Sequence, residues 1–150
     1  MTSDFDVIIS GAGPAGSTAA LAPGSSGLCV ALIDKERFPR EKVCGDAIPA
    51  YVPKVLVTID PSYRAALDIR LREKGMVCRR SVFDSFLLDL ASGLDNLTAL
   101  TGTHIKNIRT GSEGVTVSTG NGHEINARLL IGFDGSTGVS KRILPSAFHT

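Results

Sequence analysis

Short apolar runs, each closed by a glycine or an acid, dominate the first part of the chain. Residues 5–10 read FDVIIS and stop at a glycine, and residues 28–34 read LCVALID and end in an acid. Apolar runs of this length, bounded by turn residues, are typical of buried strands. Residues 15–22 between them are small and compatible with a helix. The order strand, helix, strand predicts a βαβ unit with two parallel strands.

A pattern with helical spacing covers residues 83–94. Its apolar side chains recur at intervals of three and four residues: Phe83, Phe86, Leu87, Leu90, Ala91 and Leu94. This spacing predicts a helix whose apolar face packs in the core, and it disfavours a ring-stacking surface. Ser81 and Asp84 resemble a capping box at its start, and Gly93 marks its expected end.

The last third of the chain has a β-like pattern. Residues 104–109 and 115–119 predict two short strands around a Gly-Ser-Glu-Gly turn, and an Asn-Gly turn precedes a strand over 124–131. Residues 129–131 are all apolar, which predicts a strand buried on both faces that returns to the parallel sheet. The expected class is α/β, a Rossmann-like fold with a central parallel sheet and an antiparallel β hairpin crossover.

Prolines limit the predicted elements in two places. A proline inside a helix costs about 3 kcal/mol, so Pro23 predicts that the first helix ends by Ala22. The segment 47–79 is interrupted by Pro49, Pro53 and Pro61. Only a short helix over residues 62–67 can be assigned there.

Length and charge restrict the class of protein. A chain of 150 residues has the size of one domain, and 16 Lys and Arg against 15 Asp and Glu give a net charge of +1. Such a balance gives no reason to expect nucleic acid as a partner. The longest apolar run, residues 28–33, is far shorter than the roughly 20 residues of a transmembrane helix, and MTSDFD lacks the basic start of a secretory signal. These features predict a cytoplasmic protein without a transmembrane segment.

Cysteine and histidine spacing indicates no metal site. Cys29, Cys44 and Cys78 are odd in number and have no Cys-x-x-Cys spacing, so reduced thiols are expected in place of disulfides or zinc ligands. Cys29 lies in a predicted strand and is expected to pack in the core. The histidines, His104, His123 and His149, have no spacing that suggests a triad or a metal.

The first candidate for chemistry is a glycine turn. Residues 11–16 read GAGPAG, a G-x-G-x-x-G pattern placed between a strand and a helix. In that position Gly11 allows the tight turn, Gly13 lets a pyrophosphate approach the backbone, and Gly16 lets the helix pack on the strand. The first helical turn supplies N–H groups for phosphates, and Pro14 costs nothing there because that N–H has no partner within the helix.

Asp34, at the end of the second strand, fits the same kind of site. A carboxylate at this position can accept hydrogen bonds from both hydroxyls of an adenosine ribose, and it would repel a 2′-phosphate. The site therefore favours FAD or NAD over NADP, and the glycine turn alone does not separate the first two.

The loop that follows Asp34 distinguishes FAD from NAD, because it resembles a loop of one known protein group. Residues 11–17 read GAGPAGS and residues 34–46 read DKERFPREKVCGD. This resembles the flavoprotein group of aromatic hydroxylases, halogenases and geranylgeranyl reductases. It is most similar to the geranylgeranyl reductase-like branch, whose members read D/E-K-x-x-F-P-R-x-K-x-C-G-D/G. Nicotinamide dehydrogenases have no counterpart to this loop, so the resemblance implies FAD as the cofactor.

Two further motifs of that group occur in order. Residues 80–84 fit R-x-x-F-D, whose arginine in the group lies against the flavin nucleotide, and residues 132–135 fit G-x-D-G, whose aspartate helps to hold the ribose and pyrophosphate region. The resemblance also implies that the backbone near Ile105 reads the adenine edge, and that Cys44 and Gly45 lie near the flavin ring. Arg40, Lys42 and Arg80 are the candidates to offset the pyrophosphate charge.

The expected FAD-binding residues combine both arguments. They are Gly11, Gly13, Pro14, Ala15, Gly16, Asp34, Lys35, Arg40, Lys42, Cys44, Gly45, Arg80, Ile105, Asp134 and Gly135. Cys44 is the single candidate for a catalytic side chain, and a buried, inert thiol is its alternative. No metal ligand is expected.

The chain departs from the group at three points. Gly138 stands where a serine is usual, and residues 47–79 are a short, irregular remnant of a longer segment that lines the substrate cavity. A substrate-covering sheet and a second Gly-Asp motif normally follow the position of Arg142. We therefore expect residues 1–150 to form an incomplete FAD-binding domain with the substrate domain absent or incomplete, as a fragment or as a reduced module inactive alone.

The resemblance implies reduction of isoprenoid C=C bonds, with NAD(P)H or another electron donor supplying the hydride. An aromatic substrate, hydroxylated or halogenated through reduced flavin and oxygen, is the alternative within the group. Outside the group, the hypotheses are a nonenzymatic nucleotide-binding fragment and an NAD-dependent dehydrogenase, and the loop disfavours the dehydrogenase. A prenyl substrate would imply transient membrane association through that substrate, although no amphipathic anchor is visible.

Overall fold

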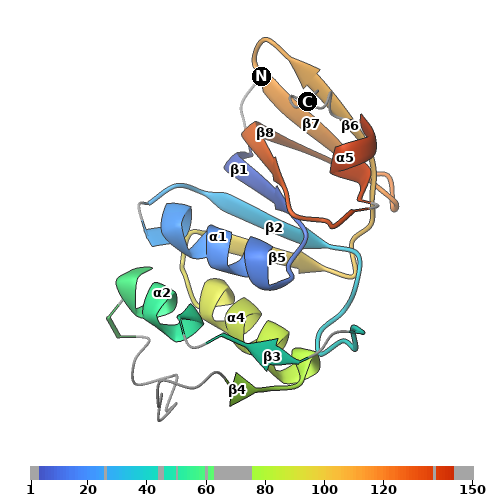
Figure 1. The fold of residues 1–150 in the computed structure, drawn as a ribbon. Helices are drawn as coiled ribbons and strands as arrows, with labels where there is room; N and C mark the ends of the chain where they lie inside the picture. Colours follow the sequence, from blue (N-terminus) through green and yellow to red (C-terminus); the bar gives the residue numbers. More distant parts are fainter. Residues whose placement is uncertain are drawn as a thin grey trace, which may run out of the picture.

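The computed structural model describes residues 4–25, 27–43, 46–49, 51–59, 61–62, 76–136 and 138–143. It contains a six-stranded sheet with most of its helices packed on one side and a long hairpin at one end (Figure 1). The strand order is β5-β2-β1-β8-β7-β6. The strands are β1 (Phe5–Ser10), β2 (Val30–Asp34), β5 (Leu97–Thr101), β6 (Ile105–Gly111), β7 (Gly114–Thr119) and β8 (Glu124–Gly132).

The centre of the sheet is parallel and its far end is antiparallel. β1 pairs in parallel with β2 on one side and with β8 on the other, and β2 pairs in parallel with β5. β7 is antiparallel to both β6 and β8. The predicted α/β fold, with a parallel sheet and an antiparallel hairpin crossover, is therefore confirmed.

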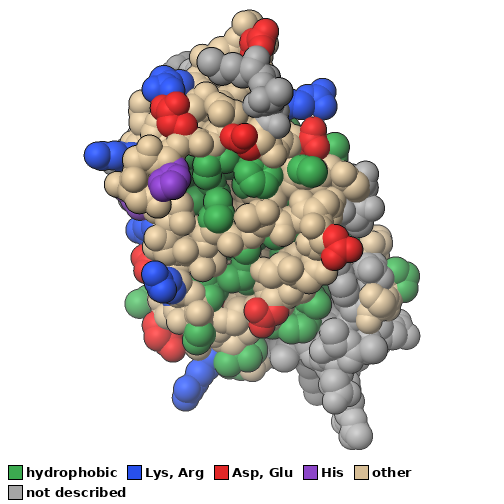
Figure 2. All heavy atoms as spheres, turned by 180° about the vertical axis from the view of Figure 1, so that it is seen from behind, with side chains coloured by type: hydrophobic (Ala, Val, Ile, Leu, Met, Phe, Trp, Pro, Cys, Tyr) green, Lys and Arg blue, Asp and Glu red, His purple; other side chains and the backbone are tan. Residues whose placement is uncertain are grey.

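Successive residues of the central strands belong to different cores, because side chains alternate between the two faces of a sheet. Val7 and Ile9 lie in a cluster with the helices α1 (Pro14–Ser25) and α4 (Arg80–Ser92). Ile8 lies in a second cluster, with residues of β6 and β7 on the other face. Seen from behind, the molecule shows hydrophobic side chains in the middle of the face and interspersed acidic and basic ones around them (Figure 2).

The predicted helical stripe forms the core face of α4. Phe83, Leu87 and Ala91 are buried against α1, and Gly93 follows the last turn, where its N–H donates to carbonyls of the helix. The prediction of a capping box at Ser81 and Asp84 is wrong. Arg79 precedes the helix without a side-chain cap, because the carboxylate of Asp84 turns to two arginines. The first N–H of the helix, on Arg80, instead donates to Oδ1 of Asp46 at 3.3 Å.

The prediction that the first helix ends by Ala22 is also wrong, since α1 continues through Pro23 to Ser25. A proline in the last turn removes the N–H of a single helical hydrogen bond, and Ala20 and Leu21 are fully buried and hold the helix in place. The carbonyl of Pro23 accepts a hydrogen bond from Leu28 N at 3.3 Å, and Gly27, with φ +81°, reverses the chain.

Two predictions of burial are corrected. Leu129 is 52% exposed although β8 joins β1 in parallel, because α1 and α4 pack on β1, β2 and β5 and leave part of β8 uncovered. Cys29 is exposed because β2 begins one residue later, at Val30.

The structure adds elements that the sequence pattern did not predict. β5 was missed because Leu97 is its one buried residue and the strand has no clear alternation. In the segment 47–79, helix α2 (Val52–Ile59) buries Leu56, and β3 (Ala47–Ile48) pairs with β4 (Met76–Val77) in an antiparallel arrangement. The predicted helix over 62–67 lies almost entirely outside the described residues. A last short helix, α5 (Val139–Ile143), follows β8.

No helix in the described part of the chain is both long and apolar enough to cross a membrane.

Candidate functional site

A cleft of about 550 Å³ opens where the parallel strands end. β1 pairs with β2 on one side and β8 on the other, and ligands of open α/β sheets bind at such a switch point, beyond the carboxyl ends of the strands. The predicted site residues that line the cleft are Gly11, Gly13, Asp34, Lys35, Arg40, Lys42, Ile105, Asp134 and Gly135. Three separate sequence motifs, and the start of β6 at Ile105, therefore contribute to one cleft.

Other predicted residues lie around the cleft. Gly16 is buried behind it, Pro14 is half-buried and Ala15 is exposed at the start of α1. The Arg80 guanidinium points to Asp84, and Arg80 is not among the lining residues. Cys44 and Gly45 lie outside the described residues, so their predicted place near a flavin ring stays a prediction.

Several lining residues were not predicted: Ser10, Ile33, Glu36, Glu41, Thr103, His104, Phe133, Ser136, Gly138 and Val139. Most of them sit at or just beyond the end of a parallel strand, which is the signal that could have found them. Thr103 and His104 follow β5, and they were missed because that strand was not predicted.

The glycine turn is held tightly between α1 and the end of β8. Gly11 has φ +102°, and a Cβ there would lie 2.5 Å from the carbonyl oxygen of Phe133. A Cβ on Gly16 would overlap the carbonyl oxygen of Gly11. The buried hydroxyl of Ser17 donates to Ala12 O at 3.0 Å. These contacts fix the backbone path of the turn and leave no room for side chains at two of its glycines.

Asp34 is fixed by the backbone on both sides. Its Oδ2 accepts from Ala12 N in the glycine turn at 2.7 Å, and its Oδ1 accepts from Glu36 N at 2.9 Å. Each carboxylate oxygen can accept more than one hydrogen bond, so both can also receive the hydroxyls of a ribose. The two backbone bonds therefore orient the carboxylate toward the cleft side of the turn, as the predicted role requires.

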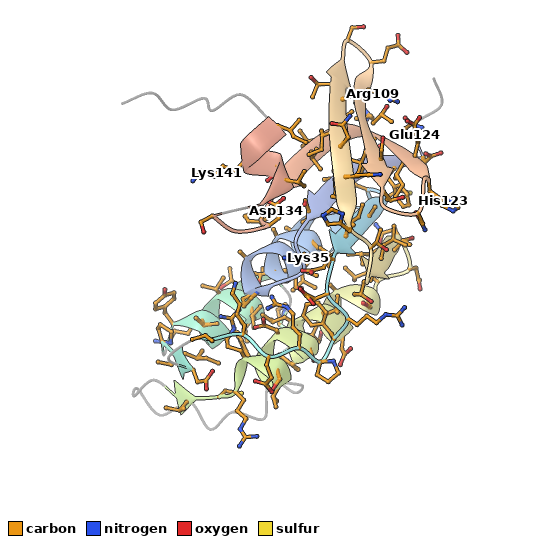
Figure 3. All side chains as sticks on the ribbon, turned by 90° about the vertical axis from the view of Figure 1, so that its right-hand side faces the viewer. Lys35, Arg109, His123, Glu124, Asp134 and Lys141 are labelled. Carbon is orange, nitrogen blue, oxygen red and sulfur yellow. The ribbon has the colours of Figure 1, made fainter. Side chains whose placement is uncertain are left out.

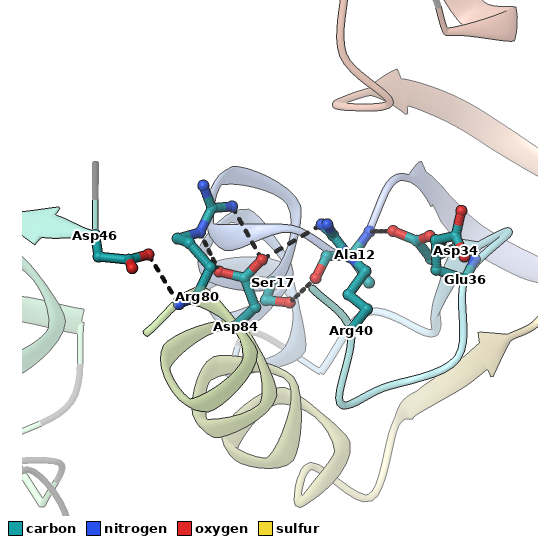
Figure 4. A network of polar contacts seen from close by, with 8 residues as sticks. All are labelled: Ala12, Ser17, Asp34, Glu36, Arg40, Asp46, Arg80 and Asp84. Atoms are coloured by element: carbon teal, nitrogen blue, oxygen red, sulfur yellow. Dashed lines mark hydrogen bonds and ion pairs between the residues drawn. The ribbon is translucent and has the colours of Figure 1, made fainter. Parts of the chain in front are cut away.

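Arg40 reaches across from the loop to the glycine turn (Figure 4). Its guanidinium lies 5.1 Å from the centroid of the Phe38 ring, and its Nη2 would be 3.3 Å from a Cβ on Gly13. Nη2 also pairs with Oδ2 of Asp84 at 3.3 Å. The Nε of Arg40 is buried without a hydrogen-bond partner among the described residues.

Asp84 joins Arg40 to α4. The Nε and Nη2 of Arg80 donate to its two oxygens at 2.7 and 2.9 Å, and its side chain is fully buried. Fork-to-fork pairs of this kind are among the stronger hydrogen-bonded ion pairs of proteins. Arg80 and Arg40 thus meet on one carboxylate behind the glycine turn.

Asp134 is the centre of a second polar cluster. Its Oδ2 accepts from Ser10 Oγ at 3.1 Å and from Ser140 N at 2.9 Å, and the hydroxyl of Ser140 donates to its Oδ1. It thereby links β1, the end of β8 and α5. A Cβ on Gly138 would overlap this carboxylate. The absence of a side chain at Gly138 therefore makes room for Asp134.

Replacing Gly138 by serine tests this packing. We expect the new Cβ to displace Asp134 from Ser140 and to lower stability by about 1–3 kcal/mol, the usual cost of overpacking. The measurement is the melting temperature, with Ser136→Ala in the same turn as the control because that side chain is exposed. An unchanged melting temperature in Gly138→Ser would contradict the packing argument.

Lysines and acids around the mouth of the cleft are solvated. Lys35 is 68% exposed and lies 4.0 Å from Glu36, and Lys42 is also exposed. Figure 3 places Lys35 and Asp134 at the end of the sheet opposite the Arg109–Glu124 pair. Among the described residues, no three His, Cys, Asp or Glu side chains are grouped as metal ligands would be.

The residues present fit a dinucleotide in this cleft. The Gly13 backbone is open to the cleft, the buried Nε of Arg40 beside it has no hydrogen-bond partner in the described part of the chain, and the start of α1 adds free N–H groups. Asp34, the start of β6 at Ile105 and the Asp134 turn line the same cleft. A pyrophosphate at the glycine turn would place a nucleoside next to Asp34.

Two curated relatives match nearly the whole chain. The geranylgeranyl diphosphate reductase of Rhodobacter capsulatus is 33% identical over 162 residues, which cover 95% of this chain and 40% of that protein. The digeranylgeranylglycerophospholipid reductase 1 of Methanothermobacter thermautotrophicus is 31% identical over 163 residues, with 90% of this chain and 40% of that protein covered. The chain spans about two fifths of the length of these relatives. No family model matches it.

Solved structures share the fold. The Diels-Alderase PyrE3 superposes with a TM-score of 0.79 at 25% identity, over 93% of this chain and 34% of that one. The halogenase PltM in complex with phloroglucinol and FAD gives a TM-score of 0.71 at 19% identity, over 92% of this chain and 36% of that one. The Rossmann-like prediction is confirmed by these neighbours.

Proposed function

This chain belongs to the FAD-dependent oxidoreductase and hydroxylase group of flavoproteins, and we propose that it forms the FAD-binding part of a reductase of isoprenoid C=C bonds. The observation that supports FAD in the cleft is the meeting of the glycine turn, Asp34, Arg40 and Asp134 around one space. The observation that favours a reductase is the identity above 30% to two prenyl-group reductases along nearly the whole chain.

Each residue of the cleft has a task in this proposal. Asp34 accepts the ribose hydroxyls, the backbone of Gly13 and the start of α1 receive the pyrophosphate, and Arg40 offsets its charge. The Asp134 turn, with Gly135, bounds the pyrophosphate from the side of β8. Flavin, when bound, supplies the hydride chemistry that no protein side chain can carry out. Within this chain the residues bind and orient, and no described side chain is assigned as a general acid or base.

The proposed cofactor is tested by binding. We expect the purified protein to carry flavin absorption in the visible range or to acquire it when FAD is added, and to release FAD on denaturation. FMN and NADP are the controls, because FMN has no adenosine for the Asp34 site and NADP carries a 2′-phosphate that the Asp34 carboxylate would repel. If none of the three binds, the proposed function is wrong for this chain.

The proposed reaction is tested on the longest natural form of the protein. With FAD and dithionite under anaerobic conditions, a prenyl diphosphate or a prenylated quinone should gain two hydrogens for each C=C bond reduced, as mass spectrometry would measure. Hydroxylation or halogenation of an aromatic compound in the presence of oxygen would instead favour a monooxygenase or a halogenase, the activities in the names of two structural neighbours. Binding of FAD without turnover under either condition would favour a nonenzymatic nucleotide-binding role.

A further inference from the structure

Asp84 is the one charged side chain among the described residues that is fully buried. A buried carboxylate is costly unless it is paired, and a hydrophobic residue at this core position of α4 would avoid that cost. The position is next to Phe83, inside the helical stripe that packs in the core. The chain therefore places a charge where packing alone would favour an apolar residue, and the reason must lie in what this charge holds.

The partners of Asp84 come from two different segments. Arg80, one turn earlier in α4, forms the fork-to-fork pair, and that pair by itself gives each carboxylate oxygen a charged hydrogen-bond donor. Arg40 is separate in sequence and adds an ion pair at 3.3 Å. The second pair is not needed to neutralise Asp84. Its consequence is that the 35–43 loop is tied to the core of the protein through the tip of Arg40.

This tie sets the position of one guanidinium group. Nη2 of Arg40 contacts Asp84 on one side and faces Gly13 on the other, and the ring of Phe38 lies against the guanidinium. Figure 4 shows Arg40 between Asp84 on α4 and Ala12 in the glycine turn. An arginine on a loop has many rotamers, and its ordering before a ligand arrives lowers the entropic cost of binding.

A second contact holds the other end of the same loop region. Asp46 accepts Arg80 N on its Oδ1 at 3.3 Å and Cys78 N on its carbonyl oxygen at 2.8 Å. The loop is therefore attached to the start of α4 both before and after Cys44 and Gly45. Lys42, between the two attachments, is exposed and provides the internal comparison.

We propose that Asp84 is a positioning residue that holds Arg40 over the glycine turn, ready for the pyrophosphate of a dinucleotide. Asp84 does not touch the ligand in this proposal and acts through Arg40. The identity of the ligand as FAD rests on the proposed function. The position of Arg40 does not depend on the proposed function, so it can be tested without any cofactor.

The first experiment tests, in the absence of cofactor, whether Asp84 holds the Arg40 side chain. Trypsin must take an arginine side chain into its specificity pocket, so Arg40 held by Asp84 should be cut slowly, whereas exposed Lys42 should be cut readily. In Asp84→Asn we expect the initial rate of cleavage after Arg40, relative to cleavage after Lys42, to rise at least about fivefold through local opening. Asp89→Asn, an exposed acid of the same helix, should leave this ratio unchanged. An unchanged ratio in Asp84→Asn overturns the proposal.

The second experiment measures the coupling in FAD binding. Arg40→Gln and Asp84→Asn should each raise the dissociation constant of FAD by about tenfold, and the double variant should bind about as weakly as Arg40→Gln alone, because residues that act through one contact are not additive. If the dissociation constant of the double variant instead rises by the product of the two single-variant factors, Asp84 acts independently of Arg40. That result would overturn the proposal. Wild-type protein that binds no FAD but shows the expected trypsin ratios would contradict the proposed function and leave the positioning role supported.

A folding defect is controlled by a second substitution. Melting temperatures are measured for every variant, and cleavage in the strands, after Lys106 and Arg128, reports global unfolding. If Asp84→Asn does not fold, Asp84→Glu is used, since it keeps the charge and moves it by one methylene. We expect an increase of about twofold or more in the Arg40 to Lys42 ratio from this displacement. A wild-type ratio in Asp84→Glu overturns the proposal in that case.

Discussion

Asp34→Ala should weaken FAD binding about 100-fold, which makes it one of the two largest effects that the structure predicts. A hydrogen bond to a charged group is worth about 1.5–3 kcal/mol, and the carboxylate is expected to accept two from the ribose. The substitution also frees Ala12 N and Glu36 N, which Asp34 now holds at 2.7 and 2.9 Å. Loss of these bonds loosens the glycine turn, which adds to the loss of affinity.

The measurement is a titration with FAD followed by flavin fluorescence or absorption. Asp95→Ala, which removes an exposed acid outside the cleft, is the matched control and should bind like the wild type. If Asp34→Ala keeps the affinity of the wild type within twofold, Asp34 does not hold the ribose. The FAD affinity of Asp34→Asn should lie between those of the wild type and Asp34→Ala, because the amide keeps one acceptor oxygen and loses the charge.

Gly16→Ala should lower stability at least as much as Gly138→Ser, because the new Cβ meets rigid backbone. The new Cβ would overlap the carbonyl oxygen of Gly11 and come within 3.5 Å of the Phe133 side chain, so α1 has to move away from β1 and β8. Overpacking of a rigid backbone contact costs about 1–3 kcal/mol, and each kcal/mol lowers the melting temperature of a chain of this size by about 2–4 °C. The same shift opens the turn that receives the pyrophosphate, so FAD affinity should fall with stability.

Gly111→Ala is the matched control for this experiment. A Cβ at Gly111 meets nothing within 4 Å, and this glycine does not have a positive φ. Its melting temperature should therefore stay within about 2 °C of the wild type, since surface substitutions change stability by about 0.5 kcal/mol or less. A similar drop in both variants would refute the close contact between Gly16 and Gly11.

The prediction from sequence succeeded where a local pattern has one physical solution. FDVIIS followed by a glycine turn gives β1 with the bounds that were predicted, and the stripe from Phe83 to Leu94 gives α4. It failed where the deciding contact is distant. β5 forms because β2 offers a free edge to Leu97–Thr101, and no alternation within that strand indicates this. Pro23 stays helical because the core holds α1, against its own propensity.

The candidate site shows the same division. Asp34 and the glycines of the turn were predicted because strand, turn and helix are neighbours in the chain, and local chemistry explains their types. Arg40, Arg80 and Asp134 were predicted through resemblance, which gave residues but no contacts. The roles of Cys44 and Gly45 stay predictions. Asp84 was read as half of a capping box, whereas in the structure it pairs with Arg80 one turn earlier in the same helix and, because the loop packs against α4, also with Arg40.

The sequence by itself determined the βαβ unit, the glycine turn and the acid that follows it, because each of these depends on residues close together in the chain. Only the tertiary structure decided that Asp84 binds Arg40 as well as Arg80, that Asp134 accepts a hydrogen bond from Ser10 of β1, and that Arg40 lies over Gly13. Each of these contacts joins two segments that are far apart in the chain. Their geometry follows from how the sheet and helices pack, which no local pattern of apolar and polar residues encodes.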